Sequence, residues 1–173
     1  KTIDGGNSWT DIAAENNFYH FKNIQFTNAS TGYCVGEHGK MQKTTDGGQT
    51  WSYLPTSTTY DLNDLFFLNT NLGYIVGETG SVIKTTDGGL SFTNVNAGGN
   101  NDLLSVYFLN SDTGWVCGTN STVFKTLNGG TTWVPETLPS FTSRAYDIVF
   151  TDAFTGYIGS WANRIYKTTD GGS

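Results

Sequence analysis

The stretch KTTDGGQTW at residues 43–51 decides the fold, because closely similar copies of it occur five times in the chain. It opens the chain as KTIDGGNSW (1–9), returns as KTTDGGLSF (84–92) and KTLNGGTTW (125–133), and begins again as KTTDGGS (167–173). Successive motif lysines stand 42, 41, 41 and 42 residues apart. A catalytic motif usually occurs once, whereas repetition with this period is typical of solenoids and propellers. We therefore interpret the motif as architecture.

Three further short segments repeat together with the motif. The first comprises NIQF (23–26), DLFF (64–67), SVYF (105–108) and DIVF (147–150). The second comprises TGYCVG (31–36), LGYIVG (72–77), TGWVCG (113–118) and TGYIG (155–159), and the third directly precedes each motif. All are rich in β-branched or aromatic residues and bounded by turn formers, which is typical of strands. The sequence predicts an all-β fold of four-stranded repeats, the motif joining the third strand to the fourth.

The motif itself has the composition of a tight hairpin turn. Asp46 can accept hydrogen bonds from nearby backbone N–H groups, and Gly47 and Gly48 permit positive φ. Trp51 then packs beside the strands as an apolar anchor. The positions expected to have this structural role in the five copies are Asp4, Trp9, Asp46, Trp51, Asp87, Phe92, Asn128, Trp133 and Asp170.

The pattern Ser/Thr-x-Asp-x-Gly-x-Thr-Trp resembles the Asp-box, or bacterial neuraminidase repeat. The whole unit is similar to the propeller family of the photosystem II assembly factor Ycf48, and the resemblance covers essentially all 173 residues. It implies β-propeller blades, one four-stranded blade per repeat. The repeat units run over 1–42, 43–83, 84–124 and 125–166, with a partial fifth box at 167–173. Asn128, Phe92 and the missing last Trp depart from the pattern and predict weaker blades.

How the blades close is open at this point. The chain divides into a last strand at 8–13, three whole blades, and three strands of another blade at about 146–169. We expect a fragment of a larger propeller, since the chain begins inside a repeat. The alternatives are a ring closed by its own four blades, with strand 8–13 completing the last one, and two copies that together form eight blades.

Composition limits the partners. The net charge of −6 and the pI near 4.6 argue against nucleic acid, which needs clustered Lys and Arg. No apolar run approaches the length of a membrane helix. Cys34 and Cys117 differ by one position within their repeats, so we expect buried free thiols on opposite sheet faces. Much Thr, Asn and Gly fits an exported or cell-surface bacterial protein.

A ligand surface is expected on the face that the resemblance places opposite the Asp-boxes. The linking loops 11–20, 53–61, 94–102 and 134–144 vary while the strands hardly change, and variable loops on a constant scaffold commonly carry recognition. Polar and aromatic residues of these loops, of the short turns between second and third strands, and of the channel rim suit peptides or glycans. These candidates are His20, Asn23, Glu37, His38, Tyr60, Asp61, Asp64, Glu78, Asp102, Asn120, Arg144, Tyr146, Asp147, Trp161 and Arg164.

Catalytic alternatives have little sequence support. Sialidases resemble one another in an arginine triad, whereas this chain has only Arg144 and Arg164. Glu37 and Glu78 occupy equivalent positions in adjacent repeats and could form a carboxylate pair. His20, His38 and Glu37 are interpreted as ordinary polar residues rather than metal ligands. We expect a non-catalytic binding or scaffold module without cofactor or metal, whose partner is a protein or glycan. The alternatives are part of an Asp-box hydrolase and a photosystem assembly factor.

Overall fold

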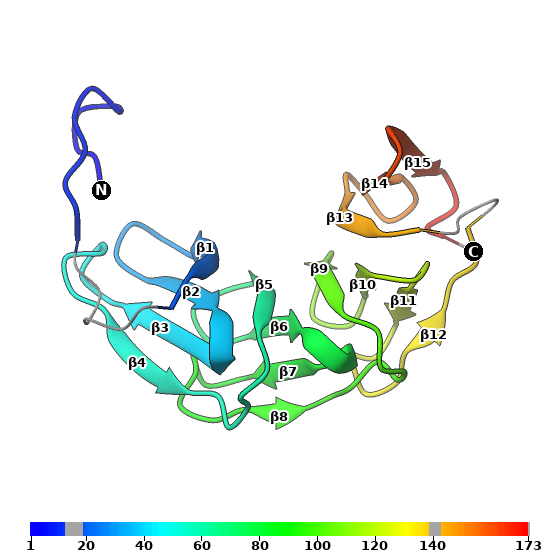
Figure 1. The fold of residues 1–173 in the computed structure, drawn as a ribbon, viewed down its shortest axis with the longest axis horizontal. Helices are drawn as coiled ribbons and strands as arrows, with labels where there is room; N and C mark the ends of the chain where they lie inside the picture. Colours follow the sequence, from blue (N-terminus) through cyan, green and yellow to red (C-terminus); the bar gives the residue numbers. More distant parts are fainter. Residues whose placement is uncertain (13–18, 139–142, 173) are drawn as a thin grey trace.

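Four small antiparallel sheets follow one another along an open arc (Figure 1). The structure is a computed structural model that describes residues 1–12, 19–138 and 143–172. Each sheet is one blade, and its strands pair in the order in which they occur in the sequence. The predicted all-β blades are thus confirmed.

The blades are numbered 1 to 4 along the chain. Blade 1 contains β1 (Phe21–Phe26), β2 (Gly32–Gly36), the 3-10 turn η1 (Glu37–Gly39), β3 (Lys40–Thr44) and β4 (Ser52–Pro55). Blade 2 contains β5 (Leu62–Phe67), β6 (Gly73–Gly77), η2 (Glu78–Gly80), β7 (Val82–Thr85) and β8 (Thr93–Asn94). Blade 3 contains β9 (Leu103–Phe108), β10 (Gly114–Gly118), β11 (Val123–Thr126) and β12 (Val134–Pro135). Blade 4 contains β13 (Ala145–Phe150), β14 (Gly156–Ser160) and β15 (Arg164–Thr168).

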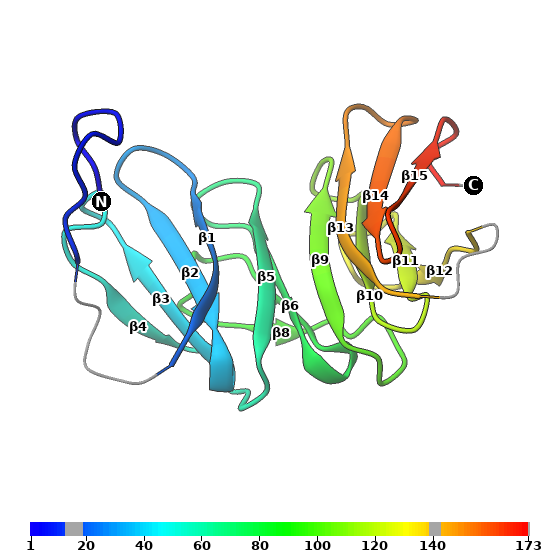
Figure 2. The ribbon, with the colours of Figure 1, turned by 45° about the horizontal axis from the view of Figure 1, so that its top comes forward.

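The first strand of every blade lies on the concave side of the arc. Strands β1, β5, β9 and β13 run side by side there, and the later strands of each blade follow outward (Figure 2). Each inner strand pairs with its neighbour through one register shift near its start. Such a bulge turns the strand and redirects a side chain. The inner strands therefore present one short row of side chains per blade to the concave side.

The predicted strand at 8–13 is wrong for residues 8–12, which form no strand. Residue 13, like the middle of loops 11–20 and 134–144, lies outside the described residues. The two chain ends lie at opposite ends of the arc (Figure 1), so residues 8–12 do not complete blade 4. A strand forms only where another strand offers it a hydrogen-bonding edge, and residues 8–12 lie beside blade 1 instead. The ring closed by its own four blades is therefore also wrong.

The Asp-box turns have the predicted geometry. Asp46 accepts hydrogen bonds from the backbone N–H groups of Gln49 at 2.8 Å and Thr50 at 2.9 Å. The Thr50 hydroxyl also donates to it at 2.6 Å, and these bonds hold the pKa of the Asp46 carboxyl well below its usual range. Gly47 and Gly48 adopt φ of 71° and 77°, a conformation that glycine reaches without steric cost.

Asn128 performs the same task in the fourth box. Its side-chain oxygen accepts the Thr132 N–H at 2.8 Å, and its amide nitrogen donates to the Thr132 hydroxyl at 2.8 Å. A neutral amide thus replaces the carboxylate while keeping both bonds. The turn of blade 3 is closed in the same way as that of blade 1.

Successive blades pack through a stacked pair of aromatic rings. Tyr33 of blade 1 lies on Phe67 of blade 2 with ring centroids 3.7 Å apart. Tyr74 and Phe108 at 3.6 Å, and Trp115 and Phe150 at 3.6 Å, repeat this contact at the next two interfaces. Each stack belongs to a separate hydrophobic cluster formed by two adjoining blades. The core is therefore divided into layers between blades.

The two cysteines lie as expected. Both are buried and free. Cys34 shares a cavity with Ile24 and Phe26 on the face of blade 1 that points away from blade 2. Cys117 belongs to the cluster between blades 3 and 4. The thiols thus lie on opposite faces of their sheets.

We predict that Phe67→Ala lowers the free energy of unfolding by about 3–5 kcal/mol, because it removes a buried ring from an inter-blade stack. Phe154→Ala, an exposed ring in the β13–β14 turn, changes it by no more than about 0.5 kcal/mol. Urea unfolding followed by tryptophan fluorescence measures both. Equal effects of the two substitutions would contradict a core built from inter-blade stacks.

Candidate functional site

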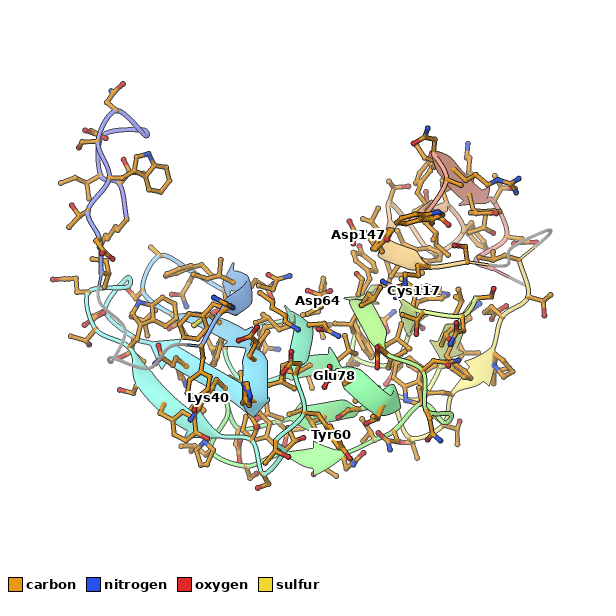
Figure 3. The ribbon with its side chains drawn as sticks, in the orientation of Figure 1. Lys40, Tyr60, Asp64, Glu78, Cys117 and Asp147 are labelled. Carbon is orange, nitrogen blue, oxygen red and sulfur yellow. The ribbon has the colours of Figure 1, made fainter. Side chains whose placement is uncertain are left out.

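The channel-rim residues Asn23, Asp64, Ser105 and Asp147 form a hydrogen-bonded row across all four blades. The Asn23 side-chain amide donates to the Asp64 carboxylate, and the Ser105 hydroxyl donates to Asp147 Oδ1 at 3.0 Å. Asp64 further accepts the N–H of Leu65 at 2.8 Å. Figure 3 shows Asp64 on β5 and Asp147 on β13, both at the inner side of the arc. The row thus ties neighbouring inner strands together.

Asp64 is the more buried of the two carboxylates in this row, with 9% of its surface exposed. Its second oxygen accepts the Val106 N–H from blade 3 at 2.9 Å. Burial raises the pKa of its carboxyl to about 6, against the opposing effect of these hydrogen bonds. Asp64 is therefore a carboxyl that titrates in the mildly acidic range.

The acidic residues of the short turns bind backbone groups. Glu37 accepts the N–H of His20 at 3.3 Å, and Glu78 accepts the N–H of Asp61 at 3.2 Å. The hydrogen bond from the His20 side chain also lowers the pKa of Glu37. A general acid in a carboxylate pair needs the opposite, a raised pKa. The Glu37 and Glu78 positions thus fix the linking loops.

The aspartates of the linking loops close the gap to the preceding blade. Asp61 accepts the N–H of His38 at 2.9 Å, and Asp102 accepts the N–H of Thr79 at 3.1 Å. His38 and Thr79 adopt φ of 55° and 56°, which is uncommon for residues with a side chain. The carboxylates stabilise these turns from outside. Asn120 has a similar conformation, and its amide donates to Asn101 at 2.9 Å.

Exposed aromatic and basic side chains gather near blade 1. Lys40 Nζ lies 4.9 Å from the ring centroids of both Tyr19 and Tyr53, which is cation–π distance. The Tyr19 ring contacts the His38 ring at 5.0 Å, and the Tyr60 side chain is half exposed. Lys40 and Tyr60 both lie toward the loop-bearing side of blades 1 and 2 (Figure 3). We call Tyr19, His38, Lys40, Tyr53 and Tyr60 the blade 1 aromatic cluster.

A second pair of rings lies at the other end of the arc. Tyr146 and Trp161 are exposed, with centroids 6.3 Å apart. The Trp161 N–H donates to the Arg144 carbonyl at 3.1 Å, and Arg164 donates to the Tyr166 hydroxyl at 3.5 Å. The exposed aromatic residues thus fall into two groups, one near blades 1 and 2 and one on blade 4, with the channel-rim row between them.

Three concave-side residues were missed by the sequence reasoning. Phe66 and Tyr107 occupy the centre of the inner strands, with ring centroids 5.1 Å apart, and Gln25 bonds to the backbone of Phe67 through both side-chain atoms. All three are the middle residue of the repeated I-x-F pattern. Successive residues of a strand face opposite sides of the sheet, so the middle residue points away from the side that its two apolar neighbours face.

Within residues 1–12, 19–138 and 143–172, no group of three His, Cys, Asp or Glu side chains is arranged to hold a metal ion. No helix of these residues has the length and apolarity to cross a membrane.

We predict that stability falls as the pH rises through the window between about 4 and about 6, where Asp64 titrates. The folded state holds the Asp64 proton more tightly than the unfolded chain, so ionisation costs folding free energy, up to about 3 kcal/mol for this shift. Urea unfolding of the parent chain and of Asp64→Asn across this range measures the slope. The substitution should flatten it, and parallel slopes would contradict the raised pKa.

Comparison with known proteins agrees with the repeat and the fold. Residues 54–134 match the family described as Photosynthesis system II assembly factor YCF48. Comparison with curated proteins gives no match. The family match thus runs from the last strand of blade 1 to the start of the last strand of blade 3.

Several solved structures superpose on the chain. YCF48 bound to D1 peptide has a TM-score of 0.67 at 20% identity, covering 86% of this chain and 52% of its own. YCF48 from Cyanidioschyzon merolae has a TM-score of 0.71 at 16% identity, covering 87% and 50%. The Niastella koreensis GH74 enzyme has a TM-score of 0.68 at 26% identity, covering 88% and 28%. The chain spans about half the length of the two YCF48 chains, and it has the fold of β-propeller blades, with repeats similar to those of the YCF48 family over residues 54–134.

Proposed function

We propose that the chain is a non-catalytic binding module that recognises a protein segment on the loop-bearing side of its blades. The observation that carries this proposal is a difference between the acidic and the aromatic residues of these loops. The carboxylates of Glu37, Glu78, Asp61 and Asp102 bind backbone N–H groups, while aromatic side chains on the same side stay exposed. Exposed aromatic residues suit recognition of a partner rather than acid–base chemistry.

Both aromatic groups have features that suit a peptide. In the blade 1 aromatic cluster, Lys40 adds a cation and a hydrogen-bond donor between two tyrosine rings. At blade 4, Tyr146 and Trp161 offer a second ring pair beside Arg144. Rings and a few donors held by a rigid scaffold give contact area at low entropic cost. One Ycf48 structure of the same fold is described as bound to a D1 peptide, which supports this ligand class.

A glycan is the alternative ligand class for the same surface, since sugars also pack on aromatic rings. We further propose an exported or cell-surface location, on composition alone, and a photosystem assembly role stays an alternative because of the Ycf48-type repeat. In each of these proposals the ligand binds without being chemically changed.

A hydrolase is the second candidate function, and two observations favour it. Structural neighbours include GH74 enzymes. In addition, Asp64 with its raised pKa and the exposed Asp147 both flank Ser105, and carboxyls in contrasting environments are what acid and base roles require. This pair suits acid–base catalysis better than Glu37 and Glu78 do, because the pKa of Asp64 is raised whereas that of Glu37 is lowered. Its weakness is access, because Asp64 is buried and bonded to two backbone groups.

Peptide selection tests the proposed function. We expect peptides selected from a displayed random library on the immobilised chain to lose at least tenfold in affinity with Tyr146→Ala or Trp161→Ala. The matched control is Phe154→Ala, an exposed ring at the opposite end of the same blade, which should leave affinity unchanged. Selected peptides insensitive to both substitutions would contradict this site.

Incubation with a panel of polysaccharides tests whether the chain is a hydrolase. We expect no release of reducing ends by the parent chain. Release that Asp64→Asn abolishes would overturn the non-catalytic proposal.

A further inference from the structure

A small pocket opens between the loop that leaves blade 1 and the outer strands of blade 2. Its volume is about 290 Å³, near the lower end of the range for pockets that hold small ligands. Thr56, Ser57, Thr58 and Tyr60 line it from the loop. We call it the blade 1–2 pocket.

The chemistry of this pocket is polar without charge. Blade 2 contributes the polar side chains of Ser81, Asn94 and Asn96 and the apolar side chains of Ile83 and Phe92. Among the described residues that line the pocket, none carries an ionised group. A charged ligand would lose hydration here without gaining a counter-charge. The pocket therefore suits an uncharged ligand that carries several hydroxyl groups.

The two asparagine side chains are held in place by their oxygens. Asn94 Oδ1 accepts the backbone N–H of Asn96 at 3.0 Å, and Asn96 Oδ1 accepts the N–H of Val82 at 3.3 Å. An amide side chain also has two N–H donors on its nitrogen. Within the described part of the chain, these two nitrogens make no hydrogen bond with the protein, so both are available to a ligand. Donors fixed in this way lose little entropy when a ligand binds.

The loop side of the pocket differs from the equivalent loop of the next repeat. The lining residues Thr56, Ser57 and Thr58 correspond, 41 positions further along the chain, to Ala97, Gly98 and Gly99. Three hydroxyl groups thus stand where the next repeat has one methyl group and two glycines. The scaffold does not require these hydroxyl groups at this point of the repeat.

Ser57 occupies a backbone conformation that favours glycine. Its φ is 61°, and the equivalent Gly98 has a φ of 88°. A residue with a side chain adopts this region at a cost in conformational energy. Such strain is concentrated at functional sites. The serine at this position therefore indicates a use for its hydroxyl group.

The blade 2 side also differs from its counterpart in blade 3. The lining residues Ile83, Phe92 and Asn94 correspond to Phe124, Trp133 and Pro135. The Trp133 indole N–H donates to the Val95 carbonyl at 2.8 Å, so the larger ring reaches the preceding blade. Phe92 has a smaller ring without this donor. The exchange of Trp for Phe in the third box thus leaves more room at the blade 1–2 pocket.

We propose that the blade 1–2 pocket binds one ring of a neutral saccharide, which belongs to a free oligosaccharide or to a glycan on a protein. Tyr60, labelled in Figure 3, is 50% exposed and offers its ring to the C–H face of the sugar. The side chains of Asn94, Asn96 and Ser57 bond to the sugar hydroxyl groups. The inference goes beyond the proposed function, and the peptide test at Tyr146 and Trp161 leaves this pocket unchanged.

Nuclear magnetic resonance of the whole ¹⁵N-labelled chain tests the proposal. The probes are tetrasaccharides of glucose, mannose, xylose and galactose at millimolar concentration, with tetragalacturonate as the charged counterpart. We expect at least one neutral tetrasaccharide to shift the side-chain amide signals of Asn94 and Asn96, and tetragalacturonate to shift neither. A glycoprotein with mannose-rich chains, measured before and after enzymatic removal of its glycans, shows whether a protein-linked glycan is bound as well.

Two substitutions assign the binding to the pocket. Asn94→Asp keeps the oxygen that accepts the Asn96 N–H but removes the free N–H donors, and should weaken binding about tenfold. Ser57→Gly should weaken binding while the urea midpoint stays unchanged or rises, because glycine adopts this φ without strain. The matched control is Asn110→Asp, at an exposed asparagine whose Oδ1 accepts the N–H of Asp112 at 2.9 Å, and it should leave affinity unchanged.

Three results would each overturn the proposal. The first is that neither a neutral tetrasaccharide nor the glycoprotein shifts the Asn94 and Asn96 amide signals. The second is an equal shift with tetragalacturonate. The third is an affinity that neither Asn94→Asp nor Ser57→Gly lowers.

Discussion

The stacked aromatic pair between blades is the interaction on which the rest of the structure depends. A four-stranded blade with apolar residues on both faces cannot bury them alone, so its stability comes from its neighbours. Tyr33 on Phe67, and the two equivalent stacks, bury one face of each adjoining blade. Lys43 of blade 1 also donates a hydrogen bond to the Gly88 carbonyl in the Asp-box of blade 2, at 2.9 Å, and this bond helps to fix the spacing of the two blades. Each interface is thus a repeat of the previous one.

This dependence explains where function can lie. Strand and box residues make the contacts within and between blades. The loop carboxylates also have structural contacts, since Asp61 accepts a backbone N–H from a turn of the preceding blade and Glu78 accepts one from the loop that leads into its own blade. The side chains of Tyr60 and Trp161, in contrast, are not buried in these interfaces and remain exposed. Residues that the scaffold leaves free are the ones that selection can change for a ligand.

The strands and turns could be predicted from the sequence because they depend on local chemistry. Asp46 closes its turn with hydrogen bonds to residues three and four positions away, so the sequence of the motif alone is enough to predict the turn. The role of Glu37, Asp61 and Asp102 could not be predicted, since their partners lie 17 or 23 residues away across a blade or an interface. For the same reason residues 8–12 failed as a strand, because their composition cannot show whether an edge is available to them.

Equivalent residues in different blades show how much of their burial comes from the neighbouring blade. Phe26 and Phe67 occupy the same position in similar local sequences, yet Phe26 is 44% exposed and Phe67 only 3%. The difference in free energy between them is therefore a property of the interface and cannot be assigned to the residue.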